Sequence, residues 1–174
     1  AAAPLAVVFG YACHNTTLSI QQLSGDYAGF AQLALEAAHP GTQAMFVAGA
    51  GGDQNPYPRR EIALAEAHGA ALAHAVEAVL SGELLPLAPV LVTARDEATL
   101  DFQPLRSKEE LAAWRSSGNR NQLRKADYLL ANYDTISMTC PCPVQIIRLG
   151  DRLLWIALGG EVVVDYDLRF QREF

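Results

Sequence analysis

Three apolar segments of this chain end in small residues and are each followed by a polar side chain suited to chemistry. His14 follows the first segment. Asp53 and Asn55 follow the second, and Glu161 follows the third. A neutral imidazole and a carboxylate are both ligands for zinc, and polar groups just beyond strand ends often line clefts in α/β proteins. The pattern therefore predicts a hydrolytic or metal site built from these four residues.

Each of these side chains also has a structural explanation. His14 could be a hydrogen-bonded structural histidine, and Glu161 could stand in the first turn of a helix, where negative charge is favoured. Asp53 and Asn55 could hold their loop through hydrogen bonds from side chain to backbone. Cys13 is adjacent to His14 and would point to the opposite face of a strand, so a nucleophile pair made from the two is not expected.

The glycine-rich stretch 49–53 does not fit a phosphate-binding motif. It lacks the Gly-Lys-Ser/Thr ending of a P-loop, and Gln54 stands where the last glycine of Gly-x-Gly-x-x-Gly would be. Its backbone amides could still bind an oxyanion. A phosphate-ligand protein is therefore the least favoured of the functions considered.

Strands and helices alternate along the chain, and they must position these groups. Asp26 is expected to cap one helix, while Ser107 and Glu110 form a capping box for another. A β-hairpin is expected around Gly150 and Asp151. The order predicts an α/β fold with a mixed β-sheet and flanking helices, ending in the hairpin and a helix. Strands or extended runs are expected over 5–12, 44–48, 89–102, 144–149 and 153–158, and helices over 26–39, 59–80, 107–114, 122–133 and 161–168.

Composition narrows the class of protein. The chain has 174 residues, of which 51% are hydrophobic and 18% are charged, so one domain can bury a core. A net charge of -6 gives no electrostatic footprint for nucleic acid, and no apolar run is long enough for a transmembrane segment. The odd set of Cys13, Cys140 and Cys142 is expected to consist of small buried thiols.

Four stretches of the chain, at 9–18, 23–31, 51–56 and 144–161, together resemble the neutral/alkaline (non-lysosomal) ceramidases and their bacterial relatives. They run in the same order as in that family and extend over most of the chain. The resemblance implies that residues 1–174 are part of one ceramidase-like catalytic domain that is incomplete at both ends. The cellular location stays open, and the resemblance is compatible with a secreted or periplasmic one.

In that family two histidines, a glutamate and a tyrosine hold a zinc ion. The resemblance places one histidine on His14 and the glutamate on Glu161, and it implies that the other histidine and the tyrosine lie before residue 1 and after residue 174. The two ligands of this chain are expected to converge because each would follow a strand of the same sheet. The partner implied is a small-molecule or lipid N-acyl substrate, of which ceramide, a sphingolipid, is one candidate.

The chain departs from the family at its second block. Ceramidases carry Gly-Asp-x-Ser-Pro with the serine proposed as catalytic, whereas residues 52–56 read Gly-Asp-Gln-Asn-Pro. Asn55 is a poor nucleophile. The expected function is therefore a zinc-dependent hydrolase that cleaves an amide bond with zinc-activated water, helped by Asn55, Asp53 or the loop amides. The alternative is a non-catalytic ligand-binding module that keeps the ceramidase-like fold.

Overall fold

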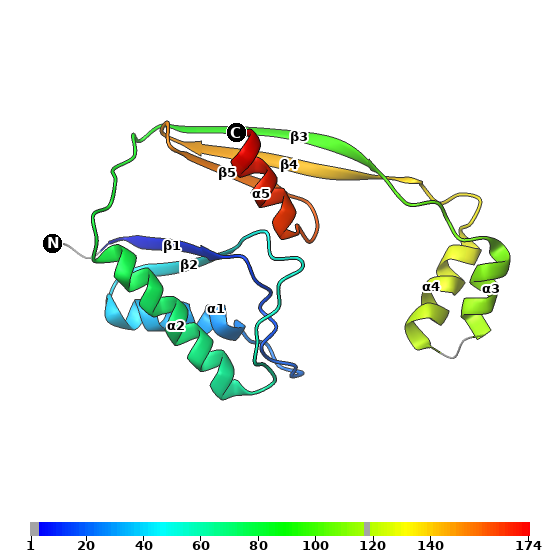
Figure 1. Ribbon diagram of the computed structural model, residues 1–174, viewed down its shortest axis with the longest axis horizontal. Helices are drawn as coiled ribbons and strands as arrows, with labels where there is room; N and C mark the ends of the chain where they lie inside the picture. The colour runs from blue at the N-terminus through cyan, green and yellow to red at the C-terminus, as the bar shows by residue number, and fades with distance from the viewer. Residues whose placement is uncertain (1–3, 117–118) are drawn as a thin grey trace. The chain divides into compact units, whose positions relative to one another are not determined.

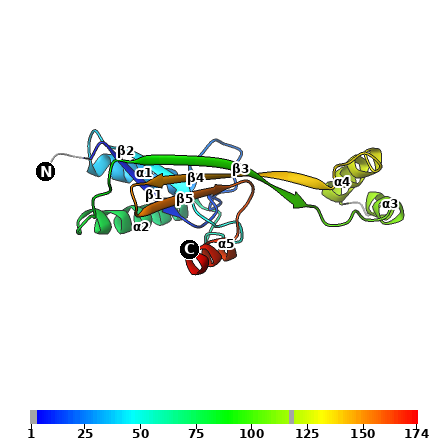
Figure 2. The same cartoon turned by 90° about the horizontal axis from the view of Figure 1, so that it is seen from above.

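The computed structural model describes residues 4–116 and 119–174, and the chain divides into two compact units. Unit 1 comprises residues 1–89 and 160–174, and unit 2 comprises residues 90–159. Figures 1 and 2 show helices and strands in both. The predicted α/β class is confirmed. No helix among the described residues has the length and apolar character needed to cross a membrane.

Unit 1 is built on a parallel pair of strands. β1 (Ala6–Tyr11) lies beside β2 (Gln43–Ala48) in parallel. Parallel neighbours need a crossover connection, and α1 (Asp26–Ala38) supplies it. Helix α2 (Ile62–Leu80) packs on α1, and α5 (Val164–Glu173) also belongs to this unit.

The core of unit 1 lies between this sheet and the helices. Val7 and Phe9 alternate along β1 with exposed neighbours, as expected for a strand with one covered face. They form one buried cluster with small and medium side chains of the helices and β2. The other members of the cluster are Ala31, Leu35, Ala44 and Ala73.

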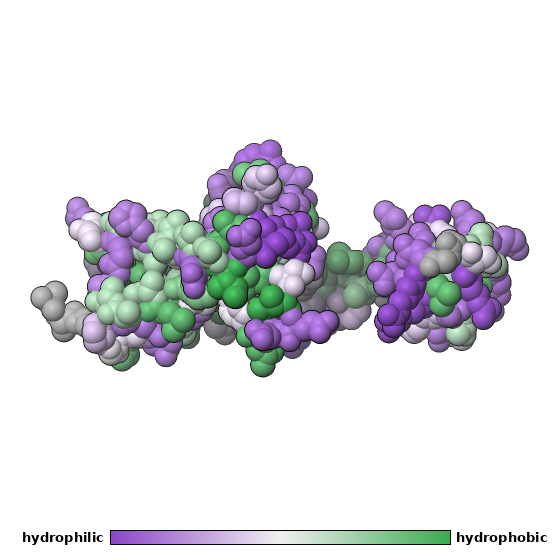
Figure 3. Space-filling model, turned by 90° about the horizontal axis from the view of Figure 1, so that it is seen from below, coloured by the Kyte–Doolittle hydropathy of each residue, from purple (hydrophilic) through white to green (hydrophobic). Residues whose placement is uncertain are grey.

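Unit 2 is an antiparallel sheet with a helical hairpin. The strand order is β3 (Leu91–Asp101), β4 (Thr139–Leu149) and β5 (Leu153–Leu158). Between β3 and β4 the chain forms α3 (Lys108–Ser116) and α4 (Arg120–Ala131), which pack on each other. On the face of these two helices that is seen at the right of Figure 3, hydrophilic side chains predominate.

Several local predictions for unit 2 are confirmed. The hairpin between β4 and β5 turns at residues 150–152, and the extended run that was predicted over 89–102 pairs with β4. The capping box forms in both directions, because Glu110 N–H donates to Ser107 Oγ and Ser107 N–H donates to Glu110 Oε2, at 3.2 and 2.8 Å.

Three expectations need correction. Parallel and antiparallel pairings both occur, but they belong to two sheets, so His14 and Glu161 do not follow strands of one sheet. The last helix begins at Val164, which leaves Glu161 in an extended segment before it. Asp26 is not the N-cap of α1: Gly25 holds that position, and the Asp26 carboxylate accepts from residues of a preceding loop. The arrangement of the sheets depends on pairing between distant segments, and the Asp26 carboxylate contacts residues eight and nine positions away, so local periodicity reveals neither.

Candidate functional site

Three segments that are far apart in the sequence are joined by hydrogen bonds around Gly52 in unit 1. The ring Nε2 of His14 lies 3.1 Å from the carbonyl oxygen of Gly52, and the His14 backbone N–H donates to Gln54 O at 2.9 Å. The Gly52 N–H donates to Val162 O at 2.8 Å. The loop after β1, the loop after β2 and the segment before α5 therefore form one backbone-bonded cluster.

Glycine is required at this junction because the backbones approach closely. A Cβ on Gly51 would collide with the backbone nitrogen of Cys13. A Cβ on Gly52 would lie 2.6 Å from the carbonyl oxygen of Glu161. Gly52 thus borders the backbone of Glu161 and accepts a hydrogen bond from His14. The structure therefore brings the segments of His14, Asp53, Asn55 and Glu161 together.

The contact of His14 with Gly52 determines the tautomer of the imidazole. A carbonyl oxygen only accepts, so Nε2 carries the proton and donates it. Nδ1 then presents a lone pair, and it donates to and accepts from no other described residue. A histidine that ligates a metal through one nitrogen and donates from the other to a backbone carbonyl has this arrangement. His14 is therefore suited to bind a zinc ion through Nδ1.

Glu161 offers a carboxylate that could serve as a ligand. Its side chain is exposed, and no described residue hydrogen-bonds or pairs with the carboxylate. Imidazole nitrogen and carboxylate oxygen are both zinc donors, so the two side chains fit the metal implied by the ceramidase resemblance. Within residues 4–116 and 119–174 no group of three or more His, Cys, Asp or Glu side chains could hold a metal ion.

Asp53 fastens the glycine loop to the last helix. Its Oδ1 accepts the backbone N–H of Val164, the first residue of α5, at 3.1 Å. This hydrogen bond holds the pKa of the exposed carboxyl below its usual value. A negative charge at a helix N-terminus is also favoured by the helix dipole. Asp53 therefore has a structural contact that spans most of the sequence, where only a local loop contact was expected from sequence.

Asn55 lies beside the segment that carries His14. Its Oδ1 accepts from the Thr16 hydroxyl at 3.0 Å and from Arg59 Nη1 at 3.2 Å. Neither Thr16 nor Arg59 was singled out from the sequence. Thr16 stands two residues after His14, but nothing in that spacing indicates a contact with position 55.

The backbone amides of the glycine loop are largely occupied. The N–H groups of Gly51, Gly52 and Gln54 donate to carbonyls of Gly49, Val162 and Gly51 respectively. Donors already bonded within the protein are not free to bind an anion. This occupancy disfavours both a phosphate site and an oxyanion hole made from these three amides.

Asp26 and Tyr27, both buried at the start of α1, hold the segment that carries His14 through hydrogen bonds to its backbone. The sequence did not indicate this role for either residue. Asp26, only 4% exposed, accepts from the backbone N–H groups of Thr17, Leu18 and Tyr27. Burial by itself raises the pKa of this carboxyl, but the hydrogen bonds outweigh burial and lower it. The phenol of Tyr27 donates to Cys13 O at 2.8 Å, and burial raises the pKa of that phenol.

The thiol of Cys13 is not activated. Burial is the main reason that its pKa lies above the usual value, so the thiol stays protonated near neutral pH. A thiolate nucleophile at this position is disfavoured.

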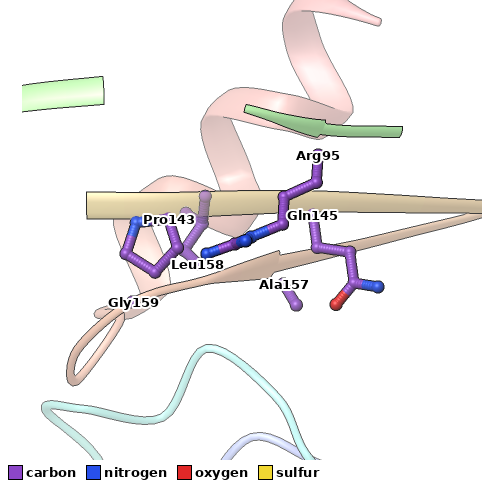
Figure 4. Close-up of a pocket in the computed structure, with 6 residues that line it drawn as sticks. All are labelled: Arg95, Pro143, Gln145, Ala157, Leu158 and Gly159. Carbon is purple, nitrogen blue, oxygen red and sulfur yellow. The ribbon is translucent and has the colours of Figure 1, made fainter. Parts of the chain in front are cut away.

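Figure 4 shows a depression on the sheet of unit 2 that lacks the features of a reaction site. Its cavity volume of about 160 Å³ is below the range of about 300–1,000 Å³ that ligand pockets occupy. The lining contains no acid, histidine or thiol. It consists of Arg95, Pro143, Gln145, Ala157, Leu158 and Gly159.

No protein-family model matches the chain, and the comparisons with curated proteins and with solved structures also give no match. The choice of function therefore rests on the motifs of the sequence and on the cluster around Gly52.

Proposed function

We propose that this chain is part of a zinc-dependent hydrolase that resembles neutral ceramidase and cleaves the amide bond of an N-acyl substrate. The observation that carries the proposal is the backbone-bonded cluster around Gly52. It gathers an imidazole, a carboxylate and a primary amide from three distant segments into unit 1. These are the groups that metal-assisted amide hydrolysis uses for ligation and for oxyanion stabilisation.

Two residues of this chain would hold the metal. His14 would bind through Nδ1, because its Nε2 proton is donated to Gly52 O. Glu161 would bind through its unpartnered carboxylate. When bound, zinc would polarise the acyl carbonyl and lower the pKa of a water molecule. The other ligands, a histidine and a tyrosine, are expected from outside residues 1–174, in keeping with the resemblance.

The remaining residues of the cluster would orient the site. Asn55 would donate its side-chain amide hydrogens to the oxygen of the acyl group as negative charge develops there. Asp53 would keep the glycine loop attached to α5 through Val164. Asp26 and Tyr27 would hold the backbone of the segment that carries His14 in place beside the glycine loop.

A non-catalytic binding module is the second candidate. The observation that favours it is Asn55, which stands where ceramidases carry the serine proposed as catalytic. Such a module would keep the zinc and the N-acyl ligand without turnover.

The test uses the intact protein and compares His14→Ala with His74→Ala, an exposed histidine of α2 as a matched control. We expect wild type and the control to hold zinc and to hydrolyse members of a panel of N-acyl substrates. We expect His14→Ala to lose both, because losing one ligand commonly undoes a site of this kind. Zinc content is measured by elemental analysis alongside hydrolysis. Wild type that holds zinc but hydrolyses nothing would favour the binding module, and activity unaffected by His14→Ala would refute the proposed mechanism.

A further inference from the structure

The side-chain amide of Asn55 has a defined orientation. Its Oδ1 accepts two hydrogen bonds, from Thr16 Oγ1 at 3.0 Å and from Arg59 Nη1 at 3.2 Å. These occupy both lone pairs of the amide oxygen. The Nδ2 group lies at the other end of the amide and donates to no described residue. The exposed side chain of Asn55 therefore carries two N–H donors, beside the segment of His14, that bond to no described residue.

Arg59 prevents the opposite orientation. A guanidinium has only donors, so turning the amide over would place its NH₂ group against the donors of Arg59. A threonine hydroxyl can donate or accept and would tolerate either orientation by itself. Arg59 therefore selects the orientation, and Thr16 reinforces it.

We propose that Thr16 and Arg59 are positioning residues that hold the Asn55 amide so that its NH₂ group faces the oxygen of the acyl substrate. This inference rests on the proposed function for the identity of that oxygen. The geometry favours the side chain as the oxyanion donor because the N–H groups of Gly51, Gly52 and Gln54 are already bonded within the protein. A preoriented donor avoids reorganisation when charge develops on the oxygen, which is the source of its catalytic effect.

The kinetic test compares variants that change the donor with variants that change only its support. Asn55→Asp keeps oxygens for Thr16 and Arg59 but removes the NH₂ donor, so we expect kcat to fall by about 10²–10³-fold with zinc content unchanged. Thr16→Val and Arg59→Leu should each lower kcat about tenfold with little change in KM, since each removes one hydrogen bond. Thr16→Ser keeps the hydroxyl that donates to Asn55 Oδ1, so its kcat should be close to that of wild type.

Arg60→Leu is the matched control for Arg59→Leu. It removes the same charge from the neighbouring position, where the side chain makes no hydrogen bond or ion pair with a described residue. We expect kcat to be unchanged in this variant. A fall in kcat equal to that of Arg59→Leu would assign the effect to local charge and would overturn the positioning role of Arg59.

A second measurement does not depend on turnover. The protein is labelled with ¹⁵N-asparagine, the side-chain NH₂ signals of Asn55 are assigned by their loss in Asn55→Asp, and the sample is titrated with octanoate, a carboxylate that hydrolysis of an octanoyl amide would release. We expect these signals to shift in wild type and in Arg60→Leu. In Arg59→Leu the shift at saturation should be much smaller than in Arg60→Leu, which controls for the lost charge, whereas Thr16→Val, which keeps Arg59, should reduce the shift only in part.

The two measurements separate the inference from the proposed function. Wild type without amidase activity, but with the expected response of Asn55 to octanoate, would refute the hydrolase and leave the orientation of Asn55 established. An active enzyme in which Thr16→Val and Arg59→Leu change neither kcat nor the NH₂ signals would overturn the inference. The absence of any Asn55 response in wild type would also overturn it.

Discussion

Several side chains in and beside the cluster are held in position by hydrogen bonds to backbone groups of other segments. Asp26 shows this most clearly, because it is buried, has a φ of +52°, and accepts from three backbone N–H groups. Asparagine and aspartate tolerate the left-handed region better than most residues. The conformation at Asp26 lets one carboxylate tie the loop at 17–18 to the start of α1, which in turn supports His14.

We predict that Asp26→Asn lowers the free energy of unfolding by about 1–3 kcal/mol, because the amide offers one acceptor oxygen to donors that the carboxylate now satisfies. The folded pKa of Asp26 lies below the ordinary value of 3.8. Its contribution is therefore present above that pH and is lost as the pH falls through the folded pKa. Urea unfolding of both proteins between pH 2 and about pH 7 measures this.

The difference between wild type and Asp26→Asn should be constant above about pH 5 and should shrink below pH 3.8. A difference that stays the same down to pH 2 would show that the charge of Asp26 contributes nothing to stability.

At the scale of elements, close packing in unit 1 depends on small residues. Helices α1 and α2 meet where a Cβ on Gly69 would lie 2.5 Å from Phe30 Cβ and 2.7 Å from Tyr27 O. Gly29 of α1 is different, because a Cβ there would meet nothing within 4 Å. A larger side chain is therefore tolerated at Gly29 but would clash at Gly69.

We predict that Gly69→Ala destabilises the protein by about 1–3 kcal/mol through overpacking, although alanine is the better helix former. Gly29→Ala is the matched variant and should stabilise the protein by about 0.5–1 kcal/mol, because it adds helix propensity without a clash. Thermal unfolding of the two variants beside wild type tests the pair. Equal effects of the same sign would contradict the packing explanation.

A second prediction at this scale concerns the capping box of α3. Ser107→Ala should weaken the helix by about 1 kcal/mol, because its hydroxyl no longer accepts the N–H of Glu110. Ser116→Ala at the other end is the control, since its hydroxyl only donates to Ala112 O. Hydrogen exchange of the α3 amides is the measurement. Faster exchange in both variants alike would show that capping is not the cause.

At the scale of the whole molecule, the two units differ in how much they bury. Unit 1 contains a cluster of six buried hydrophobic residues. In unit 2 all eleven residues of β3 are exposed, and the buried hydrophobic residues of its described part are Leu111 and Ala126. Local stability follows buried apolar contacts and protected backbone hydrogen bonds.

We predict that the amides of β3 exchange at least about tenfold faster than those of β1 and α1 under native conditions. Hydrogen exchange followed by mass spectrometry measures both units in one sample. Repeating it over a range of protein concentrations controls for self-association. Equal protection of the two units would contradict the prediction, and protection that rises with concentration would show that another copy covers the sheet of unit 2.

The sequence by itself determined the features that arise from neighbouring residues. Periodicity of two or of about 3.6 residues located the strands and helices, and the spacing of Ser107 and Glu110 identified the capping box. It also identified His14, Asp53, Asn55 and Glu161 as polar groups just beyond apolar segments. These signals are local because side-chain alternation and capping depend on residues only two to four positions apart.

Only the tertiary structure decided which segments meet. It paired β1 with β2 and β3 with β4, connected Asp53 to Val164, and placed Thr16 and Arg59 on Asn55. Each of these contacts except that between Arg59 and Asn55 joins residues distant in sequence. Their formation depends on closing long loops and burying a shared core, and the same local pattern is compatible with many such pairings.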